Sequence, residues 1–226
     1  MKLGVLFSGG KDSTLALHKA SEKEQVSCLI TLRSKNPESY MFHTPNIEVT
    51  KLQSEALGIP LISVKTQGRI EEELADLKSA ISKAVEKFEV EGIVTGAIES
   101  VYQAQRIQRI CCSLNLWCFN PLWKREQQAL LQDLVKNGYL VIISGIFAYP
   151  LDEKWLGKEI NSEVIQKLID LKKKYGISPS GEGGEIETTV LDAPLFKKKI
   201  EILEQNVEAR GNSGIFRITK AALVAK

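Results

Sequence analysis

The segment that most constrains the fold of this chain is residues 8–13, which read SGGKDS and directly follow the apolar residues 3–7. This order predicts a strand that ends in a tight glycine-rich loop and opens into a helix at Ser13. Such a loop leaves backbone N–H groups unpaired, with the positive end of the helix dipole behind them. Glycine lets an anion approach the backbone closely and permits positive φ. We therefore predict a phosphate-binding loop, formed by Ser8, Gly9, Gly10, Lys11, Asp12 and Ser13.

Two common phosphate-binding motifs do not match this loop. A Walker loop requires glycine where the chain has Val5, and serine or threonine where the chain has Asp12. The dinucleotide fingerprint G-x-G-x-x-G has no match after Gly10. From the local pattern alone, an ordinary Gly-Gly turn capped by Ser13 stays open as an alternative.

Short apolar runs alternate with helical patterns through the first half of the chain. The expected strands are residues 3–7, 26–32, 60–64, 93–95 and 116–119, and the expected helices are residues 13–23, 47–57, 70–90 and 101–114. Repeated strand–helix units give right-handed crossovers with helices on both faces of a parallel sheet. The predicted fold class is therefore α/β, a doubly wound parallel sheet.

The second half of the chain shows a different pattern. It predicts helices at residues 125–137 and 161–175, strands at 140–143 and 188–191, and a closing hairpin of 199–209 and 215–224. Gly176 is expected to end the second of these helices. We predict a smaller C-terminal α+β domain, residues 123–226, that shares a cleft with an N-terminal domain, residues 1–122.

Ligands of doubly wound sheets bind beyond the carboxyl ends of the strands. Four polar or glycine-containing segments follow expected strands in this chain, at residues 8–13, 33–46, 66–69 and 96–100. Since these ends meet at one edge of a parallel sheet, we predict that one site collects the four segments.

Composition narrows the class of protein. A net charge of +2 over 226 residues does not suggest a dedicated nucleic-acid binder. No apolar run is long enough to cross a bilayer, and residues 3–7 are too short for a signal peptide. The four cysteines show neither C-x-x-C nor metal-ligand spacing. We expect a cytoplasmic protein with reduced thiols and with neither membrane nor direct nucleic-acid partners.

A second unusual segment is residues 181–188, GEGGEIET. Three carboxylates among three glycines repel phosphate, but they suit a cation such as Mg²⁺ or a cationic substrate. A solvated acidic turn is the alternative that the pattern leaves open.

Six segments in chain order carry a resemblance to a known family: SGGKDS (8–13), YMFHTPN (40–46), GAIESVYQ (96–103), NPLW (120–123), GEGGEIET (181–188) and LDAPLF (191–196). The first is similar to the pyrophosphate-binding loop of the N-type ATP pyrophosphatases. Together, the six resemble the archaeal-like diphthine–ammonia ligases, or diphthamide synthases, of that group. The resemblance covers almost the whole chain and implies a Rossmann-like fold of the adenine nucleotide alpha hydrolase type.

The resemblance implies ATP-dependent amidation of diphthine, a modified histidine on elongation factor 2, to diphthamide. ATP activates the diphthine carboxylate as an acyl-adenylate, and nitrogen from ammonium displaces AMP after pyrophosphate has left. The implied cofactors are ATP and Mg²⁺, and the implied partners are elongation factor 2 carrying diphthine and ammonium. A homodimer is left open.

The resemblance also suggests roles for single residues. Stabilising the departing pyrophosphate needs N–H donors and positive charge, so Lys11 and Asp12 are expected to be catalytic, with Asp12 as the metal ligand. His43 is the third expected catalytic residue, as a general base for the proton that ammonia loses during its attack. Gly96 is expected to join the phosphate loop in binding the nucleotide. Diphthine carries a quaternary ammonium group, which carboxylates and aromatic faces recognise. The expected substrate-binding residues are Tyr40, Glu99, Tyr102, Gln103, Glu182, Glu185, Glu187 and Thr188.

Simpler roles stay open for two of these residues. Asp12 can be a negative charge that the helix dipole favours, and His43 can be a structural hydrogen-bonding residue. Two other functions also stay open for the chain. One is a tRNA-modifying N-type ATP pyrophosphatase, for thiolation or amidation, which the missing C-x-x-C pair and small basic excess disfavour. The other is a non-catalytic nucleotide-binding adaptor.

Overall fold

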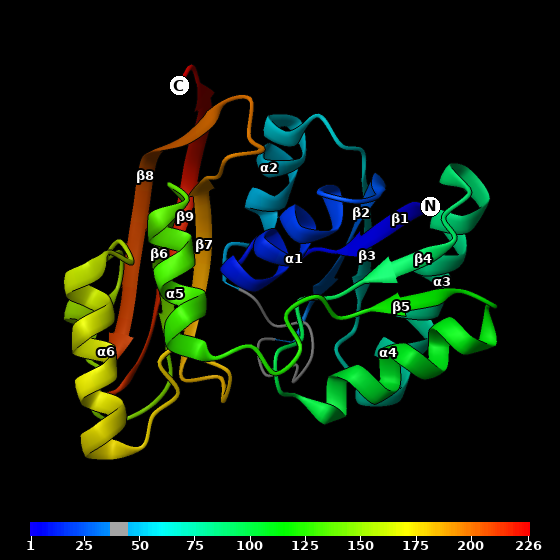
Figure 1. Ribbon diagram of the computed structural model, residues 1–226. Helices are drawn as coiled ribbons and strands as arrows, with labels where there is room; N and C mark the ends of the chain where they lie inside the picture. The colour runs from blue at the N-terminus through cyan, green and yellow to red at the C-terminus, as the bar shows by residue number, and fades with distance from the viewer. Residues whose placement is uncertain (37–44) are drawn as a thin grey trace.

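The computed structural model describes residues 1–36 and 45–226 and contains two sheets with helices around and between them (Figure 1). The strands of the first sheet are β1 (Lys2–Leu6), β2 (Gln25–Ser34), β3 (Leu61–Thr66), β4 (Gly92–Val94) and β5 (Trp117–Phe119). They run in the order β3-β2-β1-β4-β5, and every neighbouring pair is parallel. The predicted parallel sheet is therefore confirmed.

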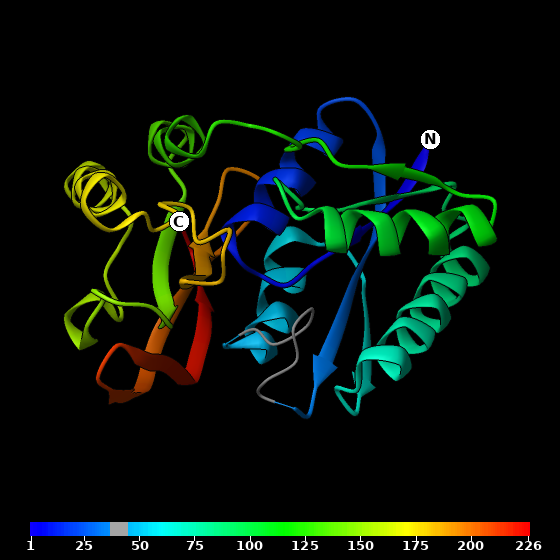
Figure 2. The same ribbon diagram turned by 90° about the horizontal axis from the view of Figure 1, so that it is seen from below.

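Helices cover both faces of this sheet, as a doubly wound fold requires. The helices are α1 (Lys11–Ser21), α2 (Thr50–Leu57), α3 (Ile70–Phe88) and α4 (Val101–Ser113). α1 and α2 lie on the face toward the second sheet, and α3 and α4 lie on the opposite face (Figures 1 and 2). A core that includes Ile30, Leu77 and Ile110 joins the sheet to α3 and α4. The predicted helix 47–57 is split, because a 3-10 turn, Ile47–Val49, precedes α2.

The second sheet is antiparallel. Its strands are β6 (Leu140–Ile146), β7 (Ile186–Asp192), β8 (Lys199–Arg210) and β9 (Ser213–Val224), in the order β7-β6-β9-β8. On the side away from the first sheet lie α5 (Gln127–Lys136) and α6 (Ser162–Tyr175), and a 3-10 turn, Glu153–Trp155, follows β6 (Figure 2). This arrangement confirms the smaller α+β unit and the closing hairpin.

The two sheets share one hydrophobic core. α1 contributes Leu15 and Leu17 to it, β6 contributes Ile143, and α5 and α6 contribute Leu130 and Leu168. Polar contacts add to this packing, since the side chain of Asn46 bonds to the backbone of β9. Its amide nitrogen donates to the Phe216 carbonyl at 2.9 Å, and its oxygen accepts from the Ile218 N–H at 2.8 Å. The two halves therefore meet over packed surfaces, and no helix in the described part of the chain is long and apolar enough to span a membrane.

Three element boundaries can be compared with the ranges predicted from the sequence. Gly176 ends α6 with φ of 75°, as predicted, and its N–H donates to the Lys172 carbonyl. α1 begins at Lys11, two residues before the predicted Ser13, because Gly10 is extended and serves as the N-cap residue. β6 runs to Ile146 and so extends beyond the predicted 140–143.

Candidate active site

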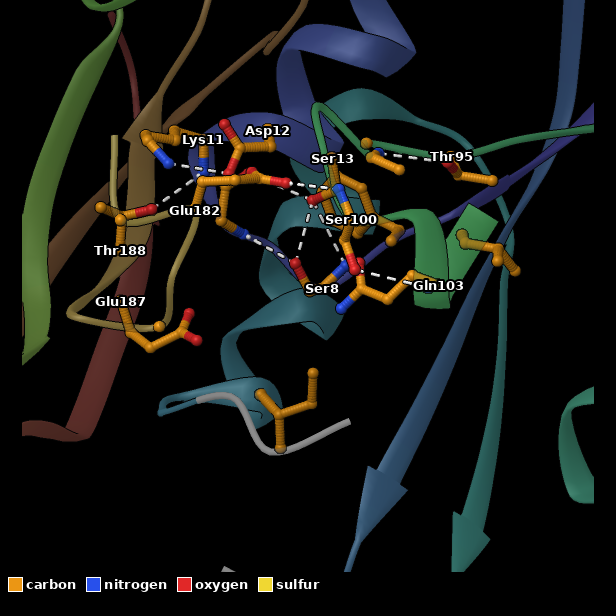
Figure 3. Close-up of a pocket in the computed structure, with 18 of the residues that line it drawn as sticks. Ser8, Lys11, Asp12, Ser13, Thr95, Ser100, Gln103, Glu182, Glu187 and Thr188 are labelled. Carbon is orange, nitrogen blue, oxygen red and sulfur yellow. Dashed lines mark hydrogen bonds and ion pairs between the residues drawn. The ribbon is translucent and has the colours of Figure 1, made fainter. Parts of the chain in front are cut away.

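A cavity of about 560 Å³ lies beyond the carboxyl ends of β1 and β4, where the first sheet meets the second half of the chain (Figure 3). Its lining comes from the loop after β1, the loop after β4 and the acidic loop of residues 181–188 before and within β7. The predicted convergence is therefore present for residues 8–13 and 96–100. Residues 66–69 do not line this cavity, and instead the Asn36 amide donates to the Gly68 carbonyl at 3.1 Å.

The phosphate loop owes its shape to Gly9 and to a buried amide on α2. Gly9 has φ of 78°, and a Cβ there would lie 2.3 Å from Oε1 of Gln53. Nε2 of Gln53 donates to the Gly9 carbonyl at 2.9 Å and to the Val190 carbonyl at 2.8 Å. The Val190 N–H also donates to the Gly9 carbonyl, at 3.0 Å. Both halves of the chain therefore hold the loop in place.

Within the loop, two serines bond to each other and to the backbone (Figure 3). The hydroxyl groups of Ser8 and Ser13 are 3.2 Å apart, and the Gly10 N–H donates to Ser8 Oγ at 3.4 Å. A Cβ at Gly96 would lie 2.8 Å from the Ser13 nitrogen, so the loop after β4 packs directly on the start of α1. Glycine at position 96 is required by this close approach.

Lys11 and Asp12 form an ion pair at the start of α1. Lys11 Nζ donates to Asp12 Oδ2 at 2.7 Å, and the lysine side chain is only 4% exposed. The other carboxylate oxygen, Oδ1, is buried and has no hydrogen-bond partner in the described structure. A buried oxygen of this kind destabilises the fold unless a cation binds it or a donor forms a hydrogen bond to it.

The donor set around Asp12 decides which metal ion the site suits. Across residues 1–36 and 45–226, no group of three or more His, Cys, Asp and Glu side chains forms a metal cage. Mg²⁺ is commonly held by one or two carboxylates together with substrate phosphates. Asp12, with one free oxygen within the predicted phosphate loop, fits that arrangement.

Two glutamates of the acidic loop bond to backbone N–H groups. Oε1 of Glu182 accepts from the N–H groups of Glu99 and Ser100, at 2.8 and 3.0 Å, and so caps the start of α4 (Figure 3). Burial raises the pKa of Glu182, the backbone bond from Glu99 opposes that shift, and Asp12 adds to it. Oε1 of Glu185 accepts from the Ser178 N–H at 2.9 Å, which closes the loop on itself.

Glu187 is placed differently. It lines the cavity, and no hydrogen bond reaches its carboxylate from the described residues. Burial raises the pKa of Glu187 to about 7, Lys11 opposes the shift and Asp12 adds to it. Because burial penalises the charged form, a cation near this carboxylate would favour its ionisation.

Thr188 connects β7 to the phosphate loop. Its hydroxyl oxygen accepts from the Lys11 N–H at 3.1 Å, and a Cβ at Gly10 would lie 3.2 Å from the Thr188 carbonyl. Thr188 therefore positions the start of α1, in addition to lining the cavity.

The remaining predicted site residues are divided between the cavity and its surroundings. Gln103 lines the cavity, and its N–H donates to Ser100 Oγ at 3.4 Å. Tyr102 does not line it, and the Arg106 guanidinium lies 3.4 Å from the centre of the tyrosine ring. Gly9, Glu99 and Glu185 are also outside the lining. Tyr40 and His43 lie outside the described residues.

Sequence reasoning missed two residues of this site, Gln53 and Phe147. Gln53 is fully buried and lies on the same face of its helical segment as Val49, Ala56 and Leu57. A polar residue within that apolar face was the available sequence signal. Phe147 lines the cavity just after β6, and no local pattern distinguishes it from a core aromatic residue.

Two family models match this chain. The diphthamide synthase N-terminal domain matches residues 1–117, and the diphthamide synthase C-terminal domain matches residues 126–224. The chain belongs to the diphthamide synthase family. The family predicted from the six sequence segments is therefore confirmed.

Curated members of the diphthamide synthase family are similar over most of this chain. The diphthine–ammonia ligase of Rattus norvegicus is 37% identical over 222 residues, which cover 89% of this chain and 83% of the rat protein. The Homo sapiens enzyme is 37% identical over 88% of this chain and 82% of its own length. The Danio rerio enzyme is 35% identical over 97% of this chain and 95% of its own length.

Solved structures are more distant. A predicted subunit of tRNA methyltransferase from Methanocaldococcus jannaschii has a TM-score of 0.46 and 20% identity, and covers 86% of this chain and 98% of its own. The U34-tRNA thiolase of Methanococcus maripaludis has a TM-score of 0.40 and 16% identity. The match covers 82% of this chain and 70% of the thiolase chain. Similarity this low carries no argument about function.

Proposed function

We propose that this chain uses ATP and ammonium to convert diphthine on elongation factor 2 into diphthamide, with release of AMP and pyrophosphate. One observation carries the proposal. A chain that matches diphthamide synthase in both halves brings its glycine-rich phosphate loop and its acidic loop to one cavity. The first loop suits a polyphosphate, and Glu187 in the second suits the fixed positive charge of diphthine.

In this proposal residues 1–122 bind ATP. The phosphates lie on residues 8–13, with Gly96 beside them, where Lys11 lines the cavity and the positive end of the α1 dipole is close. Asp12 would hold Mg²⁺ through its free oxygen, and the ion would supply further positive charge against the departing pyrophosphate. These groups stabilise charge that grows on the leaving group.

The reaction then follows from the chemistry of a carboxylate, which is a poor electrophile. A carboxylate oxygen of diphthine attacks the α-phosphorus of ATP, and the bond to the β-phosphate oxygen breaks. The acyl-adenylate so formed has a good leaving group. Ammonia, formed when ammonium loses a proton, attacks the acyl carbon, loses a further proton, and AMP leaves with the bonding electrons. The role of His43 in accepting a proton stays a prediction.

Residues 123–226 bind the protein substrate in this proposal. Glu187 and Gln103 face the cavity and can contact diphthine, whereas Glu182, Glu185 and Thr188 position the backbone around it. The substrate roles of Tyr40, Glu99 and Tyr102 stay predictions, as do the homodimer, the cytoplasmic location and the absence of direct nucleic-acid binding.

The test is incubation of the full chain with ATP, Mg²⁺, ammonium and elongation factor 2 that carries diphthine. We expect a mass change in the factor that corresponds to replacement of OH by NH₂, with AMP and pyrophosphate formed in equal amounts. Asp12→Asn should abolish both products, and Asp170→Asn, at an exposed position on α6, should not. AMP formation that depends on tRNA, or release of ADP and phosphate, would contradict the proposal.

A further inference from the structure

Gly145 on β6 lies at the centre of an unusual contact. It pairs with Glu187 on the neighbouring strand β7. A Cβ at position 145 would lie 2.7 Å from Cε2 of Phe147 and 3.1 Å from Cβ of Glu187. The space that a side chain would occupy at position 145 is therefore filled by the Phe147 ring, which lies next to the base of the Glu187 side chain.

The backbone holds Phe147 in this position relative to the acidic loop. Its N–H donates to the Glu185 carbonyl at 2.9 Å, just where β6 and β7 stop pairing. The ring is 37% exposed and lines the same cavity as Glu187. An aromatic ring and a carboxylate thus lie side by side at the wall of the cavity.

Glu187 is the carboxylate of the acidic loop that remains available to a ligand. Glu182 and Glu185 each use an oxygen to accept from backbone N–H groups, whereas the described residues give Glu187 no hydrogen bond. Lys11 is the nearby cation, but it is already paired with Asp12. In Figure 3 the Glu187 carboxylate is directed into the cavity, and no dashed line reaches it.

We propose that Phe147 and Glu187 form the subsite for the quaternary ammonium group of the substrate, an inference that rests on the proposed function. A quaternary ammonium group cannot donate hydrogen bonds, so its recognition depends on a negative charge and an aromatic face. Phe147 supplies the ring and Glu187 supplies the charge.

The sign of the pH dependence follows from the charged groups that face Glu187, which are Lys11 and Asp12. A fixed cation binds the ionised carboxylate, whose pKa is about 7 because of burial. Binding of the cation should therefore weaken as the pH falls below about 7, and the bound cation should lower the pKa of Glu187.

The direct test measures binding of choline to the full chain, with a non-hydrolysable ATP analogue present, by ligand-observed NMR. The comparison ligand is 3,3-dimethylbutan-1-ol, which has the same shape without the charge. We expect the wild-type chain to prefer choline, and Phe147→Leu and Glu187→Gln to weaken choline binding by about tenfold each. Phe147→Tyr keeps a ring and should keep binding.

Two matched controls separate this effect from general damage. Tyr175→Leu removes a ring of nearly equal exposure, 38%, on α6, and Glu201→Gln removes an exposed carboxylate on β8. Both should bind choline as the wild-type chain does. The proposal is overturned if Phe147→Leu and Glu187→Gln behave like these controls, if the neutral isostere binds as well as choline, or if the wild-type chain binds no choline.

The amidation assay distinguishes failure of the subsite from failure of the proposed function. If the wild-type chain forms diphthamide, both subsite variants should raise the KM for elongation factor 2 and leave the KM for ATP unchanged. Unchanged KM values for elongation factor 2 would overturn the subsite while the proposed function stands. If no diphthamide forms but choline binding depends on both residues, the proposed function falls and the cation subsite stands.

Discussion

Replacing Glu187 with glutamine should stabilise the ligand-free chain at pH 8 much more than at pH 5. Glu187 lies on β7 at the wall of the cavity, and burial raises the pKa of its carboxyl group from 4.5 to about 7. The native chain therefore holds this proton over a pH range in which the unfolded chain has lost it. The contribution of Glu187 to native stability therefore falls as the pH rises from about 4.5 to about 7, because the folded state binds this proton more tightly than the unfolded state does.

The magnitude follows from the difference between the two pKa values. Each pKa unit corresponds to ~1.4 kcal/mol, so the stability cost of Glu187 should grow by about 2–3 kcal/mol between pH 5 and pH 8. Glutamine has nearly the same shape and does not ionise, so Glu187→Gln removes this cost. Its effect on packing is the same at both pH values and cancels in the comparison.

Urea unfolding of the wild-type chain and Glu187→Gln, at pH 5 and pH 8, measures this difference. The variant should gain about 2–3 kcal/mol in relative stability between the two pH values, and Glu201→Gln at its exposed position should change by less than about 0.5 kcal/mol. An equal effect of Glu187→Gln at both pH values would refute the argument, because it would show that burial does not perturb this carboxylate.

Three further substitutions test how the phosphate loop is held. Gly9→Ala combines a φ of 78° with a clash against Oε1 of Gln53, so nucleotide binding measured by calorimetry should weaken at least about tenfold. Gln53→Leu removes the amide that donates to the Gly9 and Val190 carbonyls, leaving the Val190 N–H as a donor to Gly9, and should cost about 2–3 kcal/mol in urea unfolding; no loss would mean that water replaces the amide. Thr188→Val removes the acceptor for the Lys11 N–H and should raise the KM for ATP. Thr188→Ser keeps a hydroxyl acceptor and should have the KM of the wild-type chain.

Much of the fold could be predicted because it depends on patterns within short stretches of chain. Alternating apolar runs and helical periods identified every strand of the parallel sheet, and Gly176 marked the end of α6 through the positive φ that it permits. The first boundary of α1 was misplaced by two residues. The N-cap position depends on the conformation of Gly10, and a glycine pair in sequence does not show which of its members is extended.

The candidate site was predicted only in part. The phosphate loop and the acidic loop were each recognised from their own residues, and the structure brings both to one cavity. The different roles of Glu182 and Glu187 could not be predicted, since they depend on which carboxylate meets the start of α4 and which meets the cavity.

By itself, the sequence determined the family, the order of the elements and the residue types available for binding phosphate and a cation. These follow from local periodicity and from motifs whose residues are adjacent in the chain. Only the tertiary structure decided which groups are free to act, because hydrogen bonds across the two halves engage Gln53, Glu182 and Thr188 and leave Glu187 beside Phe147. Such contacts join residues far apart in sequence, so no local pattern encodes them.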